Sequence, residues 1–252
     1  MAAPETPIAF MLPTTQAITI SNASSPLLRL PQELKDRIYH FVYGGFYLHI
    51  QKRQKDPRIC LVARKTTTPH SDAIHFNDGM VERLPVASLG TCRQMYHDAR
   101  NVLYSVNTFS SYDRSLIFPF LKHLKDVIHR NLAVRSIHLD VFVRDTADER
   151  KSNHTFCALA ENLKNLRDIH IDVAEHIWNR WYVPTRRHSP AYTTRPFLQG
   201  LLELKKLPLK RVELVVAETI WDGQGRGSEY VWTTAQKQEW AQKMRRAILG
   251  LG

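Results

Sequence analysis

Histidine and acidic residues at alternate positions of three short segments could do chemistry together. They are His138, Asp140, His170, Asp172 and Glu213. Imidazole and carboxylate groups are ligands of zinc and iron, and a histidine beside a carboxylate can act as an acid–base pair. Metal binding or proton transfer by these residues requires that the fold bring them to one face.

The elements that would position these residues can be predicted from periodicity. Three segments with helical periodicity are each followed by a segment in which apolar and polar side chains alternate. The predicted helices are 116–128, 154–163 and 196–204, and the predicted strands are 135–141, 167–173 and 210–216. Strands that alternate with helices pair in parallel through right-handed crossovers. Pairing in register would place the histidines and carboxylates on one face of a parallel sheet.

The alternation within the predicted strands indicates how the sheet is covered. Ile137, Leu139 and Val141 alternate with polar residues, and the second strand repeats this pattern. A sheet enclosed by helices on both faces has strands that are apolar throughout. We therefore expect helices on one face and an open polar face opposite. The unit recurs after 32 and then 43 residues, from Ile137 to Ile169 to Val212, so the array is only leucine-rich-repeat-like.

We expect no catalytic, cofactor or metal site on this open face, and we predict that the chain is not an enzyme. Metal ligands must converge to within about 2.0–2.2 Å of the ion, whereas neighbouring strands hold their side chains about 4.8 Å apart. GxSxG, HExxH, P-loop and CxxC motifs do not occur in the sequence. A partner-binding face or a solvated one is expected instead. An enzyme is the alternative, and it would need a bound metal or a concave pocket on this face.

Aromatic residues and arginines are concentrated in the segments that follow the second and third predicted strands. The first group is Trp178, Trp181, Tyr182, Arg186, Arg187 and Tyr192, and the second is Trp221, Arg226, Tyr230 and Trp232. Parallel strands send both loops from the same edge of the sheet. Because Trp, Tyr and Arg are enriched at interface hot spots, we predict a partner-binding surface there. The alternative is that these aromatics anchor long loops onto the domain.

An amphipathic helix is predicted near the N-terminus, over residues 28–42. Pro31 suits the first helical turn, and Leu34, Ile38, Phe41 and Val42 form one apolar stripe. Two alternating segments, 46–50 and 58–63, follow as a hairpin.

A second helix is predicted over residues 86–104, and residues 107–109 then turn into an edge segment. Residues 234–249 form a further amphipathic helix at the C-terminal end.

The two N-terminal helices resemble those of an F-box. Leu30-Pro31, Glu33-Leu34 and Ile38 are similar to its first helix, and residues 92–96, Cys-Arg-Gln-Met-Tyr, are similar to a later one. Together they resemble a large group of fungal F-box-like proteins, in which an LPxELRxxIY helix is followed by the motif TCRQxYxEAxxxLYxxNTF. Residues 91–109 carry that second motif here.

The resemblance implies a docking function. An F-box binds the small adaptor of cullin-based ubiquitin ligases, and the matching residues in this chain are Leu30, Pro31, Leu34, Ile38 and Tyr96. About 40 residues separate the two helices. Loop-closure entropy costs only about 0.6 kcal/mol per doubling of length, so the helices can still pack together. The implied function is a substrate receptor of the ligase. The alternative is an F-box-like scaffold without a ligase role, whose apolar stripes form its own core.

Composition and charge limit which other classes of protein this chain can belong to. The net charge is +11, but the basic residues occur in pairs or short groups. A nucleic-acid-associated protein is therefore an alternative, and its binding would depend steeply on salt. The three cysteines are widely spaced and predict buried thiols in a reducing compartment. Neither a signal peptide nor a run of about 18 apolar residues occurs, so we expect a cytoplasmic or nuclear protein with no membrane contact.

We divide the chain into three parts. Residues 1–26 are expected to be a disordered arm, residues 27–112 an F-box-like helical module with a hairpin insertion, and residues 113–252 a repeat-like region with a C-terminal helix. The predicted fold class is α/β, with α+β character at the N-terminus and a parallel sheet covered on one face.

Overall fold

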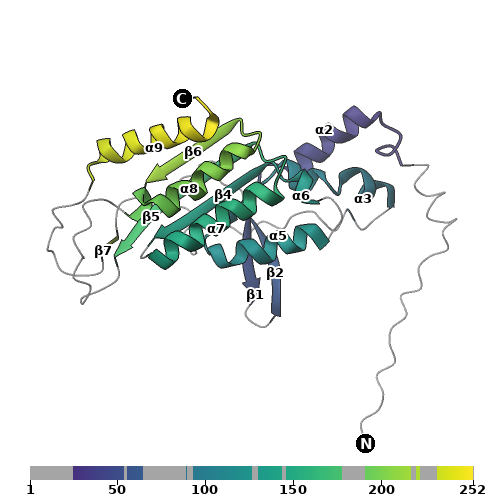
Figure 1. Cartoon of the computed structure of the whole chain (residues 1–252). Helices are drawn as coiled ribbons and strands as arrows, with labels where there is room; N and C mark the ends of the chain where they lie inside the picture. Colours follow the sequence, from purple (N-terminus) through teal and green to yellow (C-terminus); the bar gives the residue numbers. More distant parts are fainter. Residues whose placement is uncertain are drawn as a thin grey trace, which may run out of the picture.

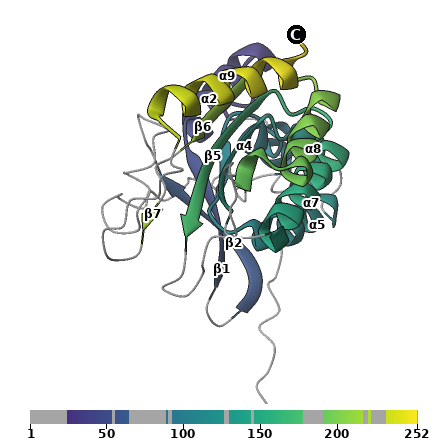
Figure 2. The ribbon, with the colours of Figure 1, turned by 60° about the vertical axis from the view of Figure 1, so that its left-hand side comes forward.

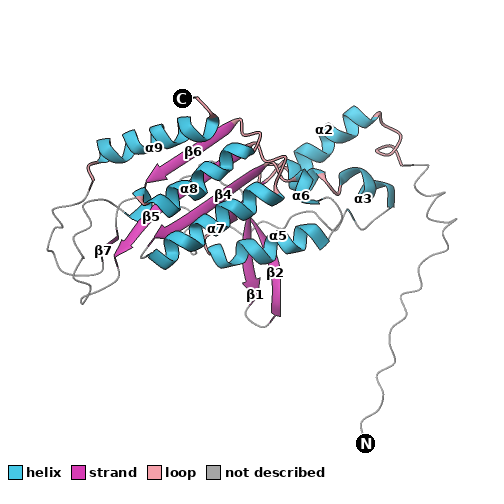
Figure 3. Ribbon diagram, in the orientation of Figure 1, coloured by secondary structure: helices cyan, strands magenta, loops and turns pink. Residues whose placement is uncertain are grey.

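A computed structural model describes residues 25–53, 56–64, 89, 93–126, 130–143, 146–177, 191–216, 220–221 and 232–251. Within these ranges the chain forms a mixed α/β fold, in which helices pack against one largely parallel sheet (Figures 1 and 3). None of the described helices is long and apolar enough to cross a membrane.

The sheet has six strands along its main path among the described residues, in the order β2-β1-β3-β4-β5-β6. The strands are β1 (Tyr47–Arg53), β2 (Asp56–Arg64), β3 (Thr108–Ser111), β4 (Ser136–Val143), β5 (Asp168–Ile177) and β6 (Arg211–Val216). β1 and β2 are antiparallel, and every other pair on this path is parallel. A short strand, β7 (Ile220–Trp221), pairs with the far end of β5. The predicted hairpin and the three predicted parallel strands are confirmed.

The helices behind these strands follow the predicted order. They are η3 (Arg114–Leu116), α5 (Ile117–Asp126), α6 (Arg130–Ala133), α7 (Thr146–Asn162), η4 (Ala191–Thr193), α8 (Arg195–Glu203), η5 (Leu204–Lys206) and α9 (Thr234–Leu249). Figure 2 shows α5, α7 and α8 together on one side of the sheet. α9 packs against β6 and α8, with Trp240, Met244 and Ile248 buried along one face.

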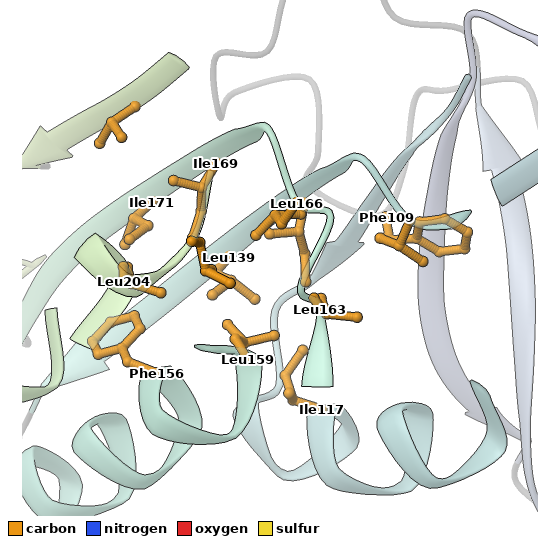
Figure 4. Packing of buried hydrophobic residues seen from close by; sticks show 14 of the residues in the cluster. Phe109, Ile117, Leu139, Phe156, Leu159, Leu163, Leu166, Ile169, Ile171 and Leu204 are labelled. Carbon is orange, nitrogen blue, oxygen red and sulfur yellow. The ribbon is translucent and has the colours of Figure 1, made fainter. Parts of the chain in front are cut away.

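The core lies between these helices and the apolar face of the sheet. Leu139, Ile169 and Ile171 from the strands meet Phe156 and Leu159 from α7, as Figure 4 shows. These are the alternate residues that the strand pattern assigns to the helix-covered face. Burying each aliphatic or aromatic side chain of this size contributes about 1.5–3 kcal/mol.

One predicted helix begins earlier than expected. α7 starts at Thr146 rather than at residue 154, because its first turns are held by polar contacts instead of an apolar stripe. Asp148 is buried and lies 2.9 Å from the guanidinium of Arg114, which also donates to Ser152. Apolar periodicity cannot detect a helix face that is buried against a charged partner.

The N-terminal helices pack at one end of the molecule (Figure 1). They are α2 (Gln32–Tyr43), α3 (Arg93–Ala99) and α4 (Val102–Ser105), and α2 contacts both of the others. The prediction of one helix over 86–104 is wrong within its described part, because the chain turns at residues 100–101 and restarts as α4.

The segment 107–109 is not an edge, as predicted, but opens an interior strand. β3 pairs with β1 on one side and β4 on the other. Asn107, just before it, is buried and donates to the carbonyl oxygens of Tyr43 (2.7 Å) and Leu103 (2.8 Å), while its own Oδ1 accepts from the Phe46 amide (2.9 Å). The side chain thus joins the ends of α2 and α4 to the strand β1. The sheet is continuous across residue 112, the predicted boundary between the second and third parts of the chain.

Candidate functional site

The strand register lines up a row of polar side chains across the sheet. His49, Ser110, His138, His170 and Glu213 are directly paired neighbours on β1, β3, β4, β5 and β6. Asp140 and Asp172 pair two residues further along their strands. The prediction that His138, Asp140, His170, Asp172 and Glu213 share one face of a parallel sheet is confirmed.

The expectation that this face is open is wrong for its central residues. His138 is fully buried, and Asp140, His170 and Asp172 are less than a tenth exposed. Tyr47 on β1 packs its ring edge-on to His138, with 6.2 Å between ring centroids. Strand alternation identifies which residues share a face, but a covering side chain from a strand far away in the sequence leaves no mark on it.

Asp172 is the centre of this cluster. Its two carboxylate oxygens lie 2.9 Å from His138 Nε2 and 2.9 Å from His170 Nε2, so one carboxylate bridges two imidazoles. The two rings lie 4.5 Å apart between centroids. Burial alone would raise the pKa of Asp172, but the bonds from His138 and His170 outweigh it and hold that pKa well below its usual range.

The outer nitrogens of both imidazoles face other polar groups. His138 Nδ1 lies 3.4 Å from the hydroxyl of Ser110, and His170 Nδ1 lies 3.6 Å from a carboxylate oxygen of Glu213. Arg211 in turn donates to Glu213 over 2.9 Å. Each imidazole is therefore oriented by one partner on each side.

Asp140 also belongs to the cluster, but its pKa is shifted in the opposite direction to that of Asp172. One of its oxygens lies 3.8 Å from His138 Nε2, and the other, Oδ2, is buried with no hydrogen-bond partner among the described residues. Burial raises the pKa of Asp140 to about 6; His138 opposes this shift and the Asp172 carboxylate adds to it. His138, His170 and Asp172 could hold a metal ion, because one ligand atom from each lies within 4.8 Å of the others.

The structure adds two residues that sequence reasoning missed, at the β1–β2 end of this face. His49 is buried and stacks on Tyr112 at 5.5 Å, and in the described part of the chain neither of its ring nitrogens has a hydrogen-bond partner. Two nitrogens of the buried Arg64 guanidinium, Nε and Nη1, are also unbonded there. Burial, reinforced by the charges of Arg64 and His138, lowers the pKa of His49 to about 4. The signal available in the sequence was a histidine at an alternate position of the predicted hairpin strand.

A second candidate site is the outer face of α2. Its buried residues are Lys35, Tyr39 and Tyr43, whereas the predicted apolar stripe is exposed. The exposed fractions are 44% for Leu34, 36% for Ile38, 90% for Phe41 and 36% for Val42. Tyr96 on the neighbouring α3 is also exposed, Pro31 is exposed, and Leu30 is half-buried. The predicted stripe therefore does not form part of the described core.

Most of the predicted aromatic–arginine surface lies outside the described residues. This holds for Trp178, Trp181, Tyr182, Arg186, Arg187, Arg226 and Tyr230. Tyr192 is instead buried beneath α9, 5.7 Å from the ring of Trp232 and 4.9 Å from that of Trp240. Trp221 lies on β7. Tyr192 and Trp232 thus anchor the segment before α8 to α9, as the alternative interpretation of these aromatics predicts.

Comparison with known proteins yields one family. A family model described as a domain of unknown function (DUF7730) matches residues 20–190, which is more than half of the chain and includes α2, both motifs, and β1 to β5. Searches of curated proteins and of solved structures gave no match.

Proposed function

This chain belongs to the DUF7730 family, and we propose that it is an F-box-like protein-binding module that docks on the small adaptor of cullin-based ubiquitin ligases. The observation that supports the proposal is the orientation of α2. Its apolar stripe faces solvent, while Lys35, Tyr39 and Tyr43 are buried against the protein.

The exposed stripe has the form of a helix-docking surface. Leu34, Ile38, Phe41 and Val42 follow one another at helical spacing along the outer face of α2. Contiguous exposed apolar side chains are uncommon on monomeric proteins and usually mark an interaction site. Together with Tyr96 on α3 they offer a surface on two adjoining helices.

The interior contacts hold this surface in a fixed arrangement. Lys35 on the buried side of α2 forms an ion pair with Asp98 on α3 at 3.0 Å. Asn107 fixes the end of α2 against α4 and β1. A docking surface that is already ordered loses less conformational entropy when it binds.

In this proposal the α/β region presents substrates to the ligase. The loops after β5 and β7 carry most of the aromatic residues and arginines that would contact them. The chain is then a receptor without catalytic activity of its own.

Binding of the purified full chain to the purified adaptor tests the proposal. Burying a Leu or Ile side chain is worth about 1.5–3 kcal/mol, so Leu34→Asp and Ile38→Asp should each weaken binding by at least about tenfold. His40→Asp is the matched control, because His40 is exposed on the same helix but lies outside the stripe. Far-UV circular dichroism checks that each variant is folded.

Two results would count against the proposal. One is a well-folded wild-type chain that does not bind the adaptor. The other is binding that persists unchanged in both stripe variants. The first result would leave an F-box-like scaffold without a ligase role, and the second would place adaptor binding on a surface other than the α2 stripe.

A further inference from the structure

We propose that His138, Asp140, His170 and Asp172 form a binding site for a divalent metal ion of the zinc class. This inference is independent of the docking function of α2. It rests on two His-x-Asp segments that parallel pairing places side by side, with His138 opposite His170 and Asp140 opposite Asp172.

The ligand atoms already converge. The Nε2 atoms of His138 and His170 each lie 2.9 Å from an oxygen of Asp172, and one atom from each of the three residues lies within 4.8 Å of the others. Ligands bound tetrahedrally at about 2.0–2.1 Å lie roughly 3.3 Å from one another. Ligation would therefore require the present separations, all within 4.8 Å, to shorten by no more than about 1.5 Å. The strand spacing of about 4.8 Å was the reason to expect no metal site from the sequence. Because the ligand atoms lie closer together than the strands require, that spacing does not prevent coordination.

The surroundings select which nitrogen of each histidine faces the ion. Both Nδ1 atoms point to outer partners, the Ser110 hydroxyl and the Glu213 carboxylate, while both Nε2 atoms point to Asp172. Metal-bound histidines commonly donate their second N–H to a carboxylate or another oxygen, which orients the ring and raises its basicity. Ser110 and Glu213 occupy those supporting positions here.

Asp140 supplies the independent observation. It is about nine-tenths buried, one of its oxygens lies 3.8 Å from His138 Nε2, and no N–H or hydroxyl group in the described ranges donates to its Oδ2. A buried carboxylate oxygen without a partner is costly. A metal ion between the two Asp residues would give that oxygen a partner and make Asp140 the fourth ligand.

The charges of the four groups favour a divalent cation. Metal ligation requires neutral imidazoles and ionised carboxylates, so the four side chains together carry two negative charges in that state. Two buried negative charges repel each other unless a cation lies between them. Two nitrogen and two oxygen ligands suit Zn²⁺ and its first-row neighbours better than Ca²⁺ or Mg²⁺, which prefer oxygen alone.

Partly exposed side chains flank the cluster on the β6 side of the sheet. Glu213, which contacts His170, is 29% exposed at its side chain, and its partner Arg211 is 66% exposed.

Zinc titration of the chelator-treated, tag-free full chain tests the site. We expect one Zn²⁺ ion per chain by isothermal titration calorimetry, and Co²⁺ bound at the same site should give the visible absorption of a four-coordinate ion. Asp172→Asn and Asp140→Asn should each weaken Zn²⁺ binding at least tenfold. His154→Gln, a change at an exposed histidine on α7, is the matched control and should bind as the wild type does.

The asparagine variants keep the test decisive where a histidine variant would not fold. Asparagine has nearly the same shape as aspartate, so Asp140→Asn removes the negative charge and one possible ligand oxygen without changing the size of the side chain. Circular dichroism and thermal melting without metal confirm that each variant is folded. Failure of the folded wild type to bind Zn²⁺ stoichiometrically would overturn the proposal and leave a hydrogen-bonded cluster only. Undiminished Zn²⁺ binding in either asparagine variant would also overturn it.

Discussion

Lys35 on α2 and Asp98 on α3 form an ion pair at 3.0 Å, and both side chains are largely buried. Lys35 occupies the arginine position of the LPxELRxxIY motif, and Asp98 occupies the glutamate position of the TCRQxYxEA motif. The two motifs therefore meet through a cation and a carboxylate that lie 63 residues apart in the sequence. This contact holds the Lys35 side of α2 against α3, while the adjacent apolar side of the helix faces solvent.

Removing one member of this pair should destabilise the fold strongly. Asp98→Ala leaves the Lys35 ammonium buried without its carboxylate, and we expect a loss of about 3 kcal/mol in the free energy of unfolding. The double change Lys35→Met with Asp98→Leu should recover most of that loss, because it removes both charges. Urea denaturation measures these values. Lys206→Ala, at an exposed ion pair with Glu203, should change little. A double variant no more stable than Asp98→Ala would contradict this account.

Asn107 should be as sensitive as a core residue. Asn107→Ala leaves two carbonyl oxygens and one amide without their partner, and each buried group left unpaired costs about 1–3 kcal/mol. We expect a loss of about 3 kcal/mol or more in chemical denaturation, with faster hydrogen exchange in α2 and β1. Asn107→Asp should not rescue it, because a carboxylate cannot donate to Tyr43 or Leu103. Asn165→Ala, which removes one exposed hydrogen bond, is the control and should cost much less.

Gly200 should not tolerate a methyl group. A Cβ at this position of α8 would lie 2.6 Å from the Cα of Asn153 on α7, so the two helices would have to move apart. Overpacking of this kind costs about 1–3 kcal/mol, and we expect Gly200→Ala to lower the melting temperature despite the better helix propensity of alanine. Gln199→Ala, at the exposed neighbouring position, should leave the melting temperature unchanged or slightly higher. A Gly200→Ala variant as stable as the wild type would show that the helices can separate freely.

His49 should make the fold acid-sensitive. A histidine in an unfolded chain has a pKa near 6.5, and burial lowers the pKa of His49 to about 4. The unfolded chain therefore takes up a proton between these values that the folded protein does not. The contribution is neutral above pH 6.5 and becomes destabilising as the pH falls towards 4, reaching about 2 kcal/mol at pH 5.

The His49→Phe variant isolates this effect. Phenylalanine retains the stacking on Tyr112 but cannot bind a proton, so the difference in unfolding free energy between pH 7 and pH 5 should be smaller than in the wild type. The His154→Gln control, at an exposed position, should keep the wild-type difference. An equal pH dependence in His49→Phe and the wild type would show that His49 is not the group responsible.

Local periodicity in the sequence predicts the helix–strand units and the face to which each strand residue belongs. A strand with an apolar residue at a matched position, Ile137, Ile169 or Val212, follows each helical segment. Because strand side chains alternate between the two faces, the next residues, His138, His170 and Glu213, must lie on the opposite face. The same logic placed the hairpin and the amphipathic character of α2. These features could be predicted because they depend on local periodicity alone.

Which faces are buried depends on contacts between elements that are far apart in the sequence. The apolar stripe of α2 faces solvent because Lys35 and Asn107 hold the other side of the helix against α3, α4 and β1. The polar face of the sheet is buried at its centre, where Tyr47 from β1 lies against His138. Burial of a polar group depends on partners distant in the chain, and side-chain periodicity contains no information about them.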